Sequence, residues 1–274
     1  MELQTLSLEI ADHVAQLKLT RGEALNTMNA AFWSEMIEAF DAIAADGSVR
    51  AVVLSSTGRH FTAGLDLQWA AADGLANRGG ETARNREYFR RKVLKMQESF
   101  NVIDRCRVPV IAVVQGGCIG GGVDLATACD IRIGTADCFF TIQEISVGIV
   151  ADVGTLQRIP TLLPQGLIRE LAYTGRRFGA EEARSHGFLN SVHASQEAAL
   201  AAATAMAQEI AGKSPMAIAG VKQVLNQGRG RTVEEGLEYV ALWNAAMLPG
   251  EDSEIAIRAQ MTRQKAEFQN LKAG

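Results

Sequence analysis

Cysteine and excess positive charge are both scarce in this 274-residue sequence, and each shortage excludes a class of protein. The four cysteines contain no pair at the two-residue spacing of a zinc ribbon or a redox motif, so buried thiols in a reducing compartment are expected. With a net charge of -4 and an isoelectric point near 5.7, the chain lacks the basic face of a nucleic-acid binder. The sequence therefore predicts no nucleic-acid partner.

Targeting and membrane segments are missing too. The chain begins without a basic region followed by an apolar run, so no signal peptide is expected, and no apolar stretch is long enough to span a bilayer. These absences predict a cytoplasmic protein with no membrane partner. The four histidines form no HExxH pattern and no GxSxG elbow is present, so neither a bound metal nor a serine hydrolase is predicted.

Apolar periodicity predicts a mixed α/β fold. Hydrophobic residues make up 47% of the chain, which is enough for a sizeable core. Alternating or continuous apolar runs predict strands within 5–20 and at 49–55, 110–114, 131–133 and 138–142. Helical spacing predicts helices at 26–45, 85–106, 121–129, 163–174, 180–187, 195–212, 214–227, 232–248 and 252–268, with a loop at 70–84.

The balance of these elements changes along the chain. Strands and helices alternate up to about residue 192, and helices alone follow. We therefore expect an α/β core at 1–192, which holds the site, and a helical region at 193–274. This second region carries apolar runs such as residues 240–243, which must pack either on the core or on another subunit.

Five glycines stand among the seven residues 116–122, after a predicted strand and at the start of a predicted helix. Glycine lets a ligand approach the backbone closely, and the first N–H groups of a helix have no partner within it. Such a turn suits an anion or a developing oxyanion, although tight strand-to-helix packing would also explain it. The spacing matches neither a dinucleotide-binding nor a P-loop fingerprint.

A second turn and three acidic residues extend this candidate site. The turn HFTAGLDL at 60–67 follows a predicted buried strand and offers further backbone N–H groups. Asp124 falls in the first turn of the glycine-opened helix, Glu144 follows a predicted strand, and Asp152 lies among apolar residues. Carboxylates in apolar surroundings have raised pKa values and exchange protons near neutral pH. Helix capping or a surface position would also explain each acid taken singly.

These motifs resemble the crotonase (enoyl-CoA hydratase/isomerase) superfamily over nearly the whole chain. The resemblance is carried by ALNTMN at 24–29, HFTAGLDL at 60–67 and GGGVDLATACDIR at 120–132. The run QEISVGIVADVGTLQRIP at 143–160 is more specific and is similar to the Δ3,5-Δ2,4-dienoyl-CoA isomerases. The resemblance implies an α/β spiral of ββα units, with a helical C-terminal region that forms a homotrimer or a dimer of trimers.

The resemblance also implies roles for single residues. The N–H groups of Leu65 and Gly121 match the two donors of an oxyanion hole, and three acids match those of the isomerase pocket. Hydratases of this superfamily carry glutamate at the position of Asp124 and lack an acid at that of Asp152. The three matching acids are Asp124, Glu144 and Asp152, and the other positions that match the substrate-binding segment are Ala63, Gly64, Asp66 and Leu67.

The implied reaction converts a 3,5-dienoyl-CoA into a 2,4-dienoyl-CoA in the β-oxidation of unsaturated fatty acids. Glu144 removes a proton from C2, the oxyanion hole holds the thioester oxygen, and Asp152 returns a proton at C6. An acyl-CoA thioester is the expected ligand, and no further cofactor is expected. Two alternatives share the fold, namely hydration of a 2-enoyl-CoA and Δ3-Δ2-enoyl-CoA isomerisation. A non-catalytic binding protein is another, although the three retained acids argue against it.

Overall fold

The computed structural model describes residues 3–74 and 81–273, and a six-stranded sheet forms its centre. Strands from β2 to β9 pair in parallel within this sheet, and β1 pairs antiparallel with β2 at one edge. In spatial order the strands are β1 (Leu6–Ala11), β2 (Val14–Leu19), β3 (Ala51–Ser56), β4 (Val110–Val114), β6 (Ile131–Thr135) and β9 (Ser191–His193). The predicted mixture of strands and helices is thus confirmed.

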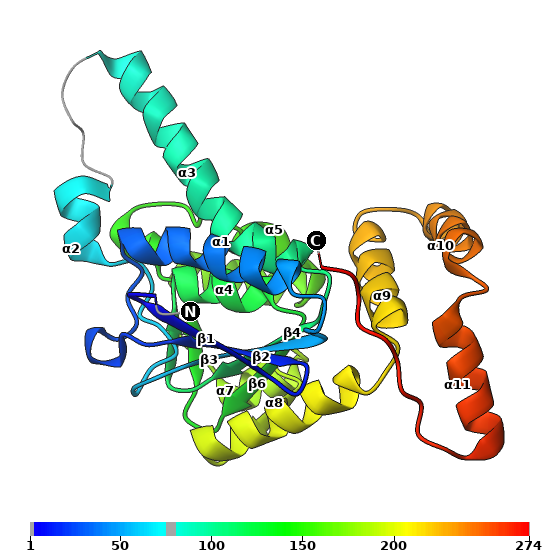
Figure 1. The fold of residues 1–274 in the computed structure, drawn as a ribbon. Coiled ribbons are helices and arrows are strands. Elements are labelled where there is room, and N and C mark those ends of the chain that lie inside the picture. Colours follow the sequence, from blue (N-terminus) through cyan, green and yellow to red (C-terminus); the bar gives the residue numbers. More distant parts are fainter. Residues whose placement is uncertain (1–2, 75–80, 274) are drawn as a thin grey trace.

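Helices cover both faces of this sheet. The helices of the described residues are α1 (Ala30–Ala45), α2 (Leu67–Trp69), α3 (Thr82–Arg105), α4 (Gly121–Ala128), α5 (Thr155–Arg158), α6 (Gln165–Thr174), α7 (Ala180–Ser185), α8 (Gln196–Ala211), α9 (Pro215–Gln227), α10 (Val233–Met247) and α11 (Glu251–Thr262). Helix α8 lies below the sheet in Figure 1, whereas α1, α4 and the base of α3 lie above it. Within residues 3–74 and 81–273, no helix is both long and apolar enough to cross a membrane.

The first two strands form a hairpin because a two-residue turn joins them. Asp12 and His13 both have positive φ, 48° and 67°, as the tightest right-twisted hairpin turns require. Alternate residues of the hairpin then face the core, where Leu6 and Leu17 are almost fully buried. The strands predicted within 5–20 are therefore confirmed.

The central strands are buried on both faces, and their alternate residues pack into two separate hydrophobic cores. In β3, Val52 and Leu54 pack into a large core with residues of α1 and α3. Ala51 and Val53 point the other way, into a smaller core under α8. Helix α8 approaches the sheet closely because every fourth residue on its inner face is a buried alanine, at Ala199, Ala203, Ala207 and Ala211.

A small second sheet forms around the glycine cluster. Strand β5 (Gly117–Ile119) pairs in parallel with β7 (Phe139–Thr141), and β7 pairs antiparallel with β8 (Phe178–Gly179). Apolar alternation predicts the region of β7 but not β5 or β8, because two or three residues are too few to show a period. The glycine segment is therefore part strand and part turn, which fixes the start of α4.

The segment between β3 and α3 differs from the loop predicted at 70–84. Helix α2 continues into a π-helical turn at Ala70–Gly74, and α3 begins earlier than expected. The loop prediction is wrong over these residues, while 75–80 lie outside the described part of the chain. Capping explains the difference, because the side chains of Asp66 and Glu81 accept hydrogen bonds from the first N–H groups of α2 and α3.

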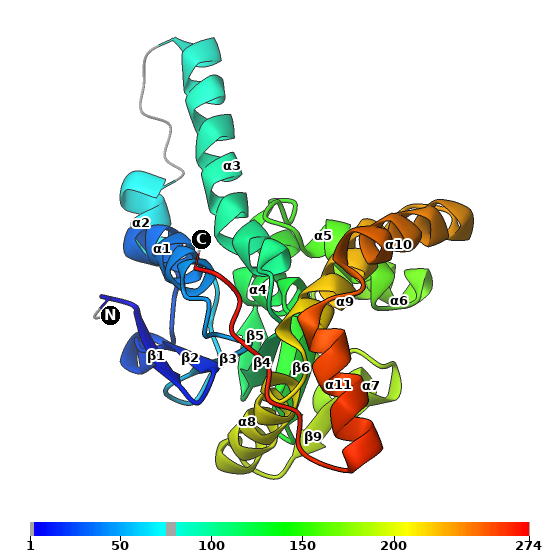
Figure 2. The same ribbon diagram turned by 45° about the vertical axis from the view of Figure 1, so that its right-hand side comes forward.

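The helical region predicted at 193–274 divides into two parts by its contacts. Helix α8 packs on the main sheet, whereas α9, α10 and α11 lie to one side of the core in Figure 1 and in front of it once that side is turned forward in Figure 2. Helix α9 is fixed there through Lys222, whose buried Nζ lies 2.7 Å from Asp130 Oδ2 and donates to two backbone carbonyls of the core. Judged by side-chain packing, α8 therefore belongs to the core, and the outer helices begin with α9.

The chain after α11 returns to the core instead of continuing as the predicted helix. Arg263 has a φ of 54° and ends α11, so the helix prediction is wrong beyond Thr262. Arg50 holds the returning tail by donating to Phe268 O at 2.7 Å and to Asn270 Oδ1 at 3.0 Å. A partner so distant in the sequence leaves no trace in a local helical pattern.

Candidate active site

One cleft brings together the segments that the sequence singles out. It lies where the turn after β3, the start of α4 and the stretch after β7 meet helices α1 and α3. Its volume of about 180 Å³ is the space of about six water molecules, so it holds the reacting part of a chain rather than a whole large ligand. Of the predicted site residues, Ala63, Leu65, Leu67, Gly121, Glu144 and Asp152 line this cleft.

The two glycine-containing turns touch each other at the cleft. Gly64 has a φ of +79°, and a methyl group on its Cα would lie 2.5 Å from Ile119 O and 3.3 Å from Gly121 N. Gly120 has a φ of +53° and directly precedes α4. Glycine is needed at both positions for its backbone angles, and Gly64 is needed for the close approach as well. Gly64 and Gly121 are consequently held close together, and Leu65 and Gly121 line the same cleft.

At these turns, two backbone N–H groups have no acceptor among residues 3–74 and 81–273. Met28 and Leu65 form an isolated parallel β-bridge. In this bridge Met28 N–H donates to Gly64 O and Met28 O accepts from Asp66 N–H, so the Leu65 N–H is not used. Gly121 is the first residue of α4, where an N–H has no acceptor within the helix. No described residue accepts a hydrogen bond from either group. Both donors are therefore available to a ligand in the cleft.

Asp124 lies behind the wall of the cleft rather than on it. Its residue surface is 0% exposed, and its Oδ1 accepts a hydrogen bond from Thr155 N–H at 2.5 Å. Its Oδ2 has no hydrogen-bond partner among residues 3–74 and 81–273. Burial raises the pKa of Asp124 to about 6, against the opposite effect of the Thr155 hydrogen bond.

Glu144 lines the cleft from the first residue of a 3-10 turn that follows β7. A methyl group on the Gly120 Cα would lie 3.3 Å from Glu144 Oε1, so this oxygen sits against the glycine turn. Burial, followed by the charge of Asp124, raises the pKa of Glu144 to about 7. A carboxyl group with this pKa exists in both protonation states at neutral pH, which suits proton transfer.

Asp152 lines the same cleft from the loop before α5. Gln97 of α3 fixes this loop by donating from Nε2 to Asp152 O at 2.7 Å. Asp152 keeps exposed surface in the single chain, yet the loss of solvent around its carboxyl still raises its pKa. Its charge also helps to raise the pKa values of Asp124 and Glu144, so the three predicted acids form one electrostatic group.

Two of the residues predicted to bind substrate lie beside the cleft instead of on its wall. Gly64 supplies the close contact with the second turn, as described above. Asp66 turns its carboxylate away to cap α2, where it accepts from Trp69 N–H at 3.1 Å and lies 3.5 Å from an Arg21 nitrogen. The Trp69 hydrogen bond lowers the pKa of Asp66, so this carboxylate stays charged and holds the turn in place.

Sequence reasoning misses four residues of the site. Trp33 and Met96 form part of its apolar wall, from α1 and α3. Thr155 acts through its backbone N–H, and Gln97 through a bond to a backbone carbonyl. Trp33 and Met96 occupy apolar positions that a helical pattern assigns to a core, and Gln97 lies far from every motif. Thr155 lies within the specific run 143–160, which was the one available signal.

Histidine and cysteine contribute no metal centre to the described part of the chain, where no group of three His, Cys, Asp or Glu side chains could hold a metal ion. His60 instead accepts a hydrogen bond at Nδ1 from Gly117 N–H at 2.8 Å. It thereby supports the glycine segment from the opposite turn.

Comparison with known proteins decides the family. Residues 9–270 match the family model described as enoyl-CoA hydratase/isomerase. The chain belongs to this family. It is 48% identical over 248 residues to the mitochondrial Δ(3,5)-Δ(2,4)-dienoyl-CoA isomerase of Homo sapiens, covering 90% of this chain and 76% of that protein. It is 41% identical over 259 residues to the peroxisomal isomerase of the same name from Arabidopsis thaliana, covering 94% and 93%.

Solved structures agree on the fold. An enoyl-CoA hydratase from Bacillus anthracis matches this family member with a TM-score of 0.88 at 26% identity, covering 97% of this chain and 99% of that one. One from Polaromonas sp. JS666 gives a TM-score of 0.87 at 25% identity, covering 96% and 99%. The predicted crotonase-like fold and the family resemblance are therefore confirmed.

Proposed function

We propose that this chain isomerises 3,5-dienoyl-CoA to 2,4-dienoyl-CoA, within the β-oxidation of unsaturated fatty acids. The observation that carries the proposal is the lining of one cleft by two carboxyls of raised pKa, Glu144 and Asp152, together with two unpaired backbone N–H groups. Relatives that are 48% and 41% identical over most of the chain carry the name of this isomerase. The chain is accordingly an acyl-CoA isomerase.

The thioester oxygen binds between Leu65 N–H and Gly121 N–H. Removing a proton beside a thioester moves negative charge onto that oxygen, so these donors stabilise the transition state more than the bound substrate. A donor of this kind contributes roughly 2.7–4 kcal/mol. Ala63 and Leu67 flank the thioester, while Gly64 and Asp66 keep the donor turn in position.

Two carboxyls then move one proton each. Glu144, as the carboxylate, removes a proton from C2, and the electron pair spreads through the diene and the thioester. Asp152, as the acid, protonates C6, so the double bonds shift from C3–C4 and C5–C6 to C2–C3 and C4–C5. Glu144 ends protonated and Asp152 ends charged, and exchange with water restores both. Positioned proton transfer of this kind contributes typically ~10²–10⁴-fold in rate.

Asp124 is a positioning residue that sets the protonation of Glu144 without touching the substrate. Its charge is the second cause of the raised pKa of Glu144, after burial. It also ties α4 to the loop of Asp152 through the hydrogen bond from Thr155 N–H. The three acids therefore divide into a base, an acid and a group that tunes the base.

Hydration of a 2-enoyl-CoA is the second candidate, because solved structures with this fold are named enoyl-CoA hydratases. Activating a water between two carboxyls needs both on the wall of the cleft, and Asp124 lies behind it with Oδ1 bound to a backbone N–H. Isomerisation from Δ3 to Δ2 does not need an acid at C6, so Asp152 favours the dienoyl substrate over this alternative as well.

The proposal extends to partners. The reaction moves protons only, so an acyl-CoA thioester is the one ligand it requires. A homotrimer or a dimer of trimers is supported by large apolar side chains exposed on the outer helices, such as Val233, Leu237 and Met261, and the mass in solution tests it. A cytoplasmic location stays a prediction, since two relatives are named mitochondrial and peroxisomal.

A direct spectroscopic assay tests the proposed function. Purified protein is mixed separately with 3,5-octadienoyl-CoA and 2-octenoyl-CoA, and ultraviolet absorbance is followed. The expected result is a rapid gain of the band of a thioester-conjugated 2,4-diene with the first substrate and a far slower change with the second. Loss of the enoyl band with the second substrate, without diene formation from the first, would identify a hydratase instead.

A further inference from the structure

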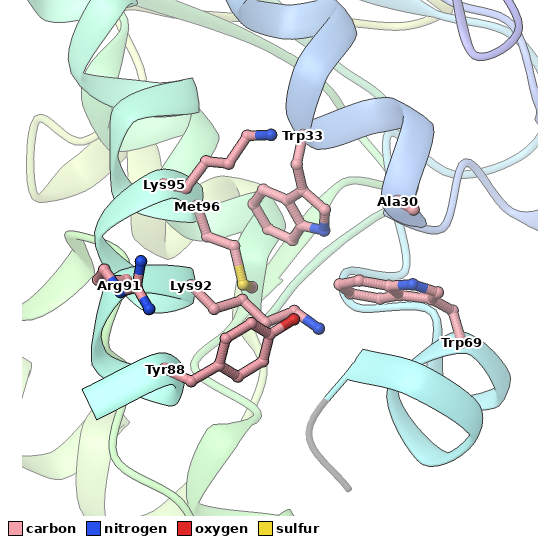
Figure 3. A pocket seen from close by; sticks show the side chains of 8 residues that line it. All are labelled: Ala30, Trp33, Trp69, Tyr88, Arg91, Lys92, Lys95 and Met96. Atoms are coloured by element: carbon pink, nitrogen blue, oxygen red, sulfur yellow. The ribbon is translucent and has the colours of Figure 1, made fainter. Parts of the chain in front are cut away.

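A second pocket adjoins the active-site cleft along helix α3. It is lined by Ala30 and Trp33 of α1, by Trp69, and by a row of α3 side chains that includes Tyr88, Lys92 and Lys95. We call it the Trp33 pocket. Figure 3 shows the rings of Trp33, Tyr88 and Trp69 around one space, with the Lys92 ammonium reaching into it.

The Trp33 pocket continues the path of the acyl chain. Trp33 and Met96 line both this pocket and the active-site cleft, so the two spaces share a wall. Met96 also adjoins Gln97, which holds the loop of Asp152 through a hydrogen bond of 2.7 Å. The Trp33 pocket therefore lies next to the part of the cleft that Asp152 lines.

An unpaired donor lies on that shared wall. Trp33 is 5% exposed, and its Nε1 is buried without a hydrogen-bond partner among the described residues. Edge-to-face packing against Phe32 and Phe100, at centroid distances of 5.3 and 5.6 Å, fixes the orientation of the indole ring. In Figure 3 this N–H points toward the space between Trp33 and Trp69. A buried donor of this kind is costly to leave unpaired, so it suits a ligand that brings an acceptor.

Positive charge gathers around the same space. Arg91, Lys92 and Lys95 line the pocket, and its described lining contains no acidic side chain. Arg91 is paired with Glu87 on the exposed side of α3, and the Lys92 Nζ lies 4.8 Å from the centroid of the Trp69 ring. Lys95 is exposed and adds a further charge at the rim. A purely hydrocarbon chain end would leave the indole N–H of Trp33 without an acceptor.

We propose that the Trp33 pocket binds the far end of the acyl chain and selects a chain that ends in a carboxylate, such as the thioester of a dicarboxylic acid. This inference rests on the proposed dienoyl-CoA isomerase function. The carboxylate accepts from Trp33 Nε1–H and lies near the ammonium groups of Lys92 and Lys95. Trp69 and Tyr88 cover the methylene groups that precede it.

The test compares two 3,5-dienoyl-CoA substrates of equal length, one ending in a methyl group and the other in a carboxylate, over a series of chain lengths. At the length that reaches the pocket, the wild-type protein is expected to give a kcat/KM about tenfold higher for the carboxylate-ended substrate, as one charged hydrogen bond provides. Equal values at every length, or a preference for the methyl end, would overturn the proposal.

Variants identify the residues that cause the preference for a carboxylate-ended substrate. Lys92→Met and Lys95→Met keep the aliphatic stem and remove the charge, and each should reduce the preference for the carboxylate end several-fold. Lys213→Met, on the exposed surface after α8, is the matched control and should keep the wild-type preference. Trp33→Phe removes the indole N–H while retaining a ring, and circular dichroism accompanies it because Trp33 belongs to the core.

The same variants separate this inference from its alternatives. If the cations served the phosphates of CoA, both substrates would lose kcat/KM equally in the lysine variants, and the proposal would be wrong. If neither substrate is isomerised, the proposed function fails, and calorimetric binding of a saturated carboxylate-ended acyl-CoA then tests the pocket alone. Tighter binding than for the methyl-ended analogue, lost in the double lysine variant, supports the subsite, and equal binding overturns it.

Discussion

The substitution Asp124→Asn should change how the stability of the protein depends on pH. Asp124 is completely buried, one of its oxygens accepts a hydrogen bond from Thr155 N–H, and the other has no described partner. Asparagine has the same shape and can keep the Thr155 hydrogen bond through its own oxygen. The variant therefore removes the ionisation of this side chain while leaving its main contact in place.

The size of the effect follows from the pKa. Burial raises the pKa of Asp124 from an ordinary value of 3.8 to about 6, a shift of about two units. Well below pH 3.8 the carboxyl is protonated in both states, so it contributes no penalty. As the pH rises, the unfolded chain ionises first, and folded stability is lost until the buried carboxyl ionises near pH 6. At 1.36 kcal/mol per unit the loss is about 3 kcal/mol.

The assay is urea unfolding of the wild-type and Asp124→Asn proteins, at equal protein concentration, at several pH values from about 3 to 8. Between these limits the wild-type protein should lose about 3 kcal/mol of unfolding free energy relative to the variant. Any constant effect of burying the new amide cancels in this comparison. If the two stability curves run parallel across the pH range, the buried Asp124 carboxylate carries no penalty and the raised pKa of Asp124 is wrong.

Two further predictions concern catalysis. In the wild-type enzyme, kcat/KM for a 3,5-dienoyl-CoA should pass through a maximum and fall on both sides of it as the pH is changed across about 7, because Glu144, with its pKa of about 7, must be a carboxylate to accept the C2 proton while Asp152 must keep the proton that it gives to C6. A rate that stays flat across this range would remove Glu144 as the base. The variant Leu65→Pro lacks one oxyanion donor and should lose ~10²–10³-fold in kcat/KM, whereas Leu65→Ala keeps the N–H and should retain most activity. Full activity in a folded Leu65→Pro protein, checked by circular dichroism, would contradict the oxyanion assignment.

The parts of the site that the sequence predicts are those encoded by short, local motifs. The glycine run 116–122 and the turn 60–67 each specify a backbone shape by themselves, since Gly64 and Gly120 occupy positive φ. The apolar context of Glu144 and Asp152 predicts raised pKa values, and both are raised. Local composition was sufficient here because each property depends on close neighbours in the chain.

The remaining parts depend on contacts between distant segments. The sequence alone does not place Trp33 beside Met96, because each reads as an ordinary core position of its own helix. The carboxylate of Asp66 lies in the predicted binding turn, but its hydrogen bond to Trp69 N–H turns it toward α2. The tail after Arg263 leaves helical geometry where Arg50 captures it from the core. In each case a contact with a distant part of the chain, and not the local sequence pattern, determines where the residue lies.

The most direct test of the two-carboxyl mechanism is the variant Asp152→Asn in deuterium oxide, with the exposed Asp12→Asn as the matched control. We expect Asp152→Asn still to bind the 3,5-dienoyl-CoA and to exchange hydrogen for deuterium at C2 through Glu144, but to lose nearly all formation of the 2,4-diene. The control should isomerise at the wild-type rate and place deuterium at C6. Near-normal diene formation by Asp152→Asn would rule out Asp152 as the acid, because C6 would then receive its proton from another group.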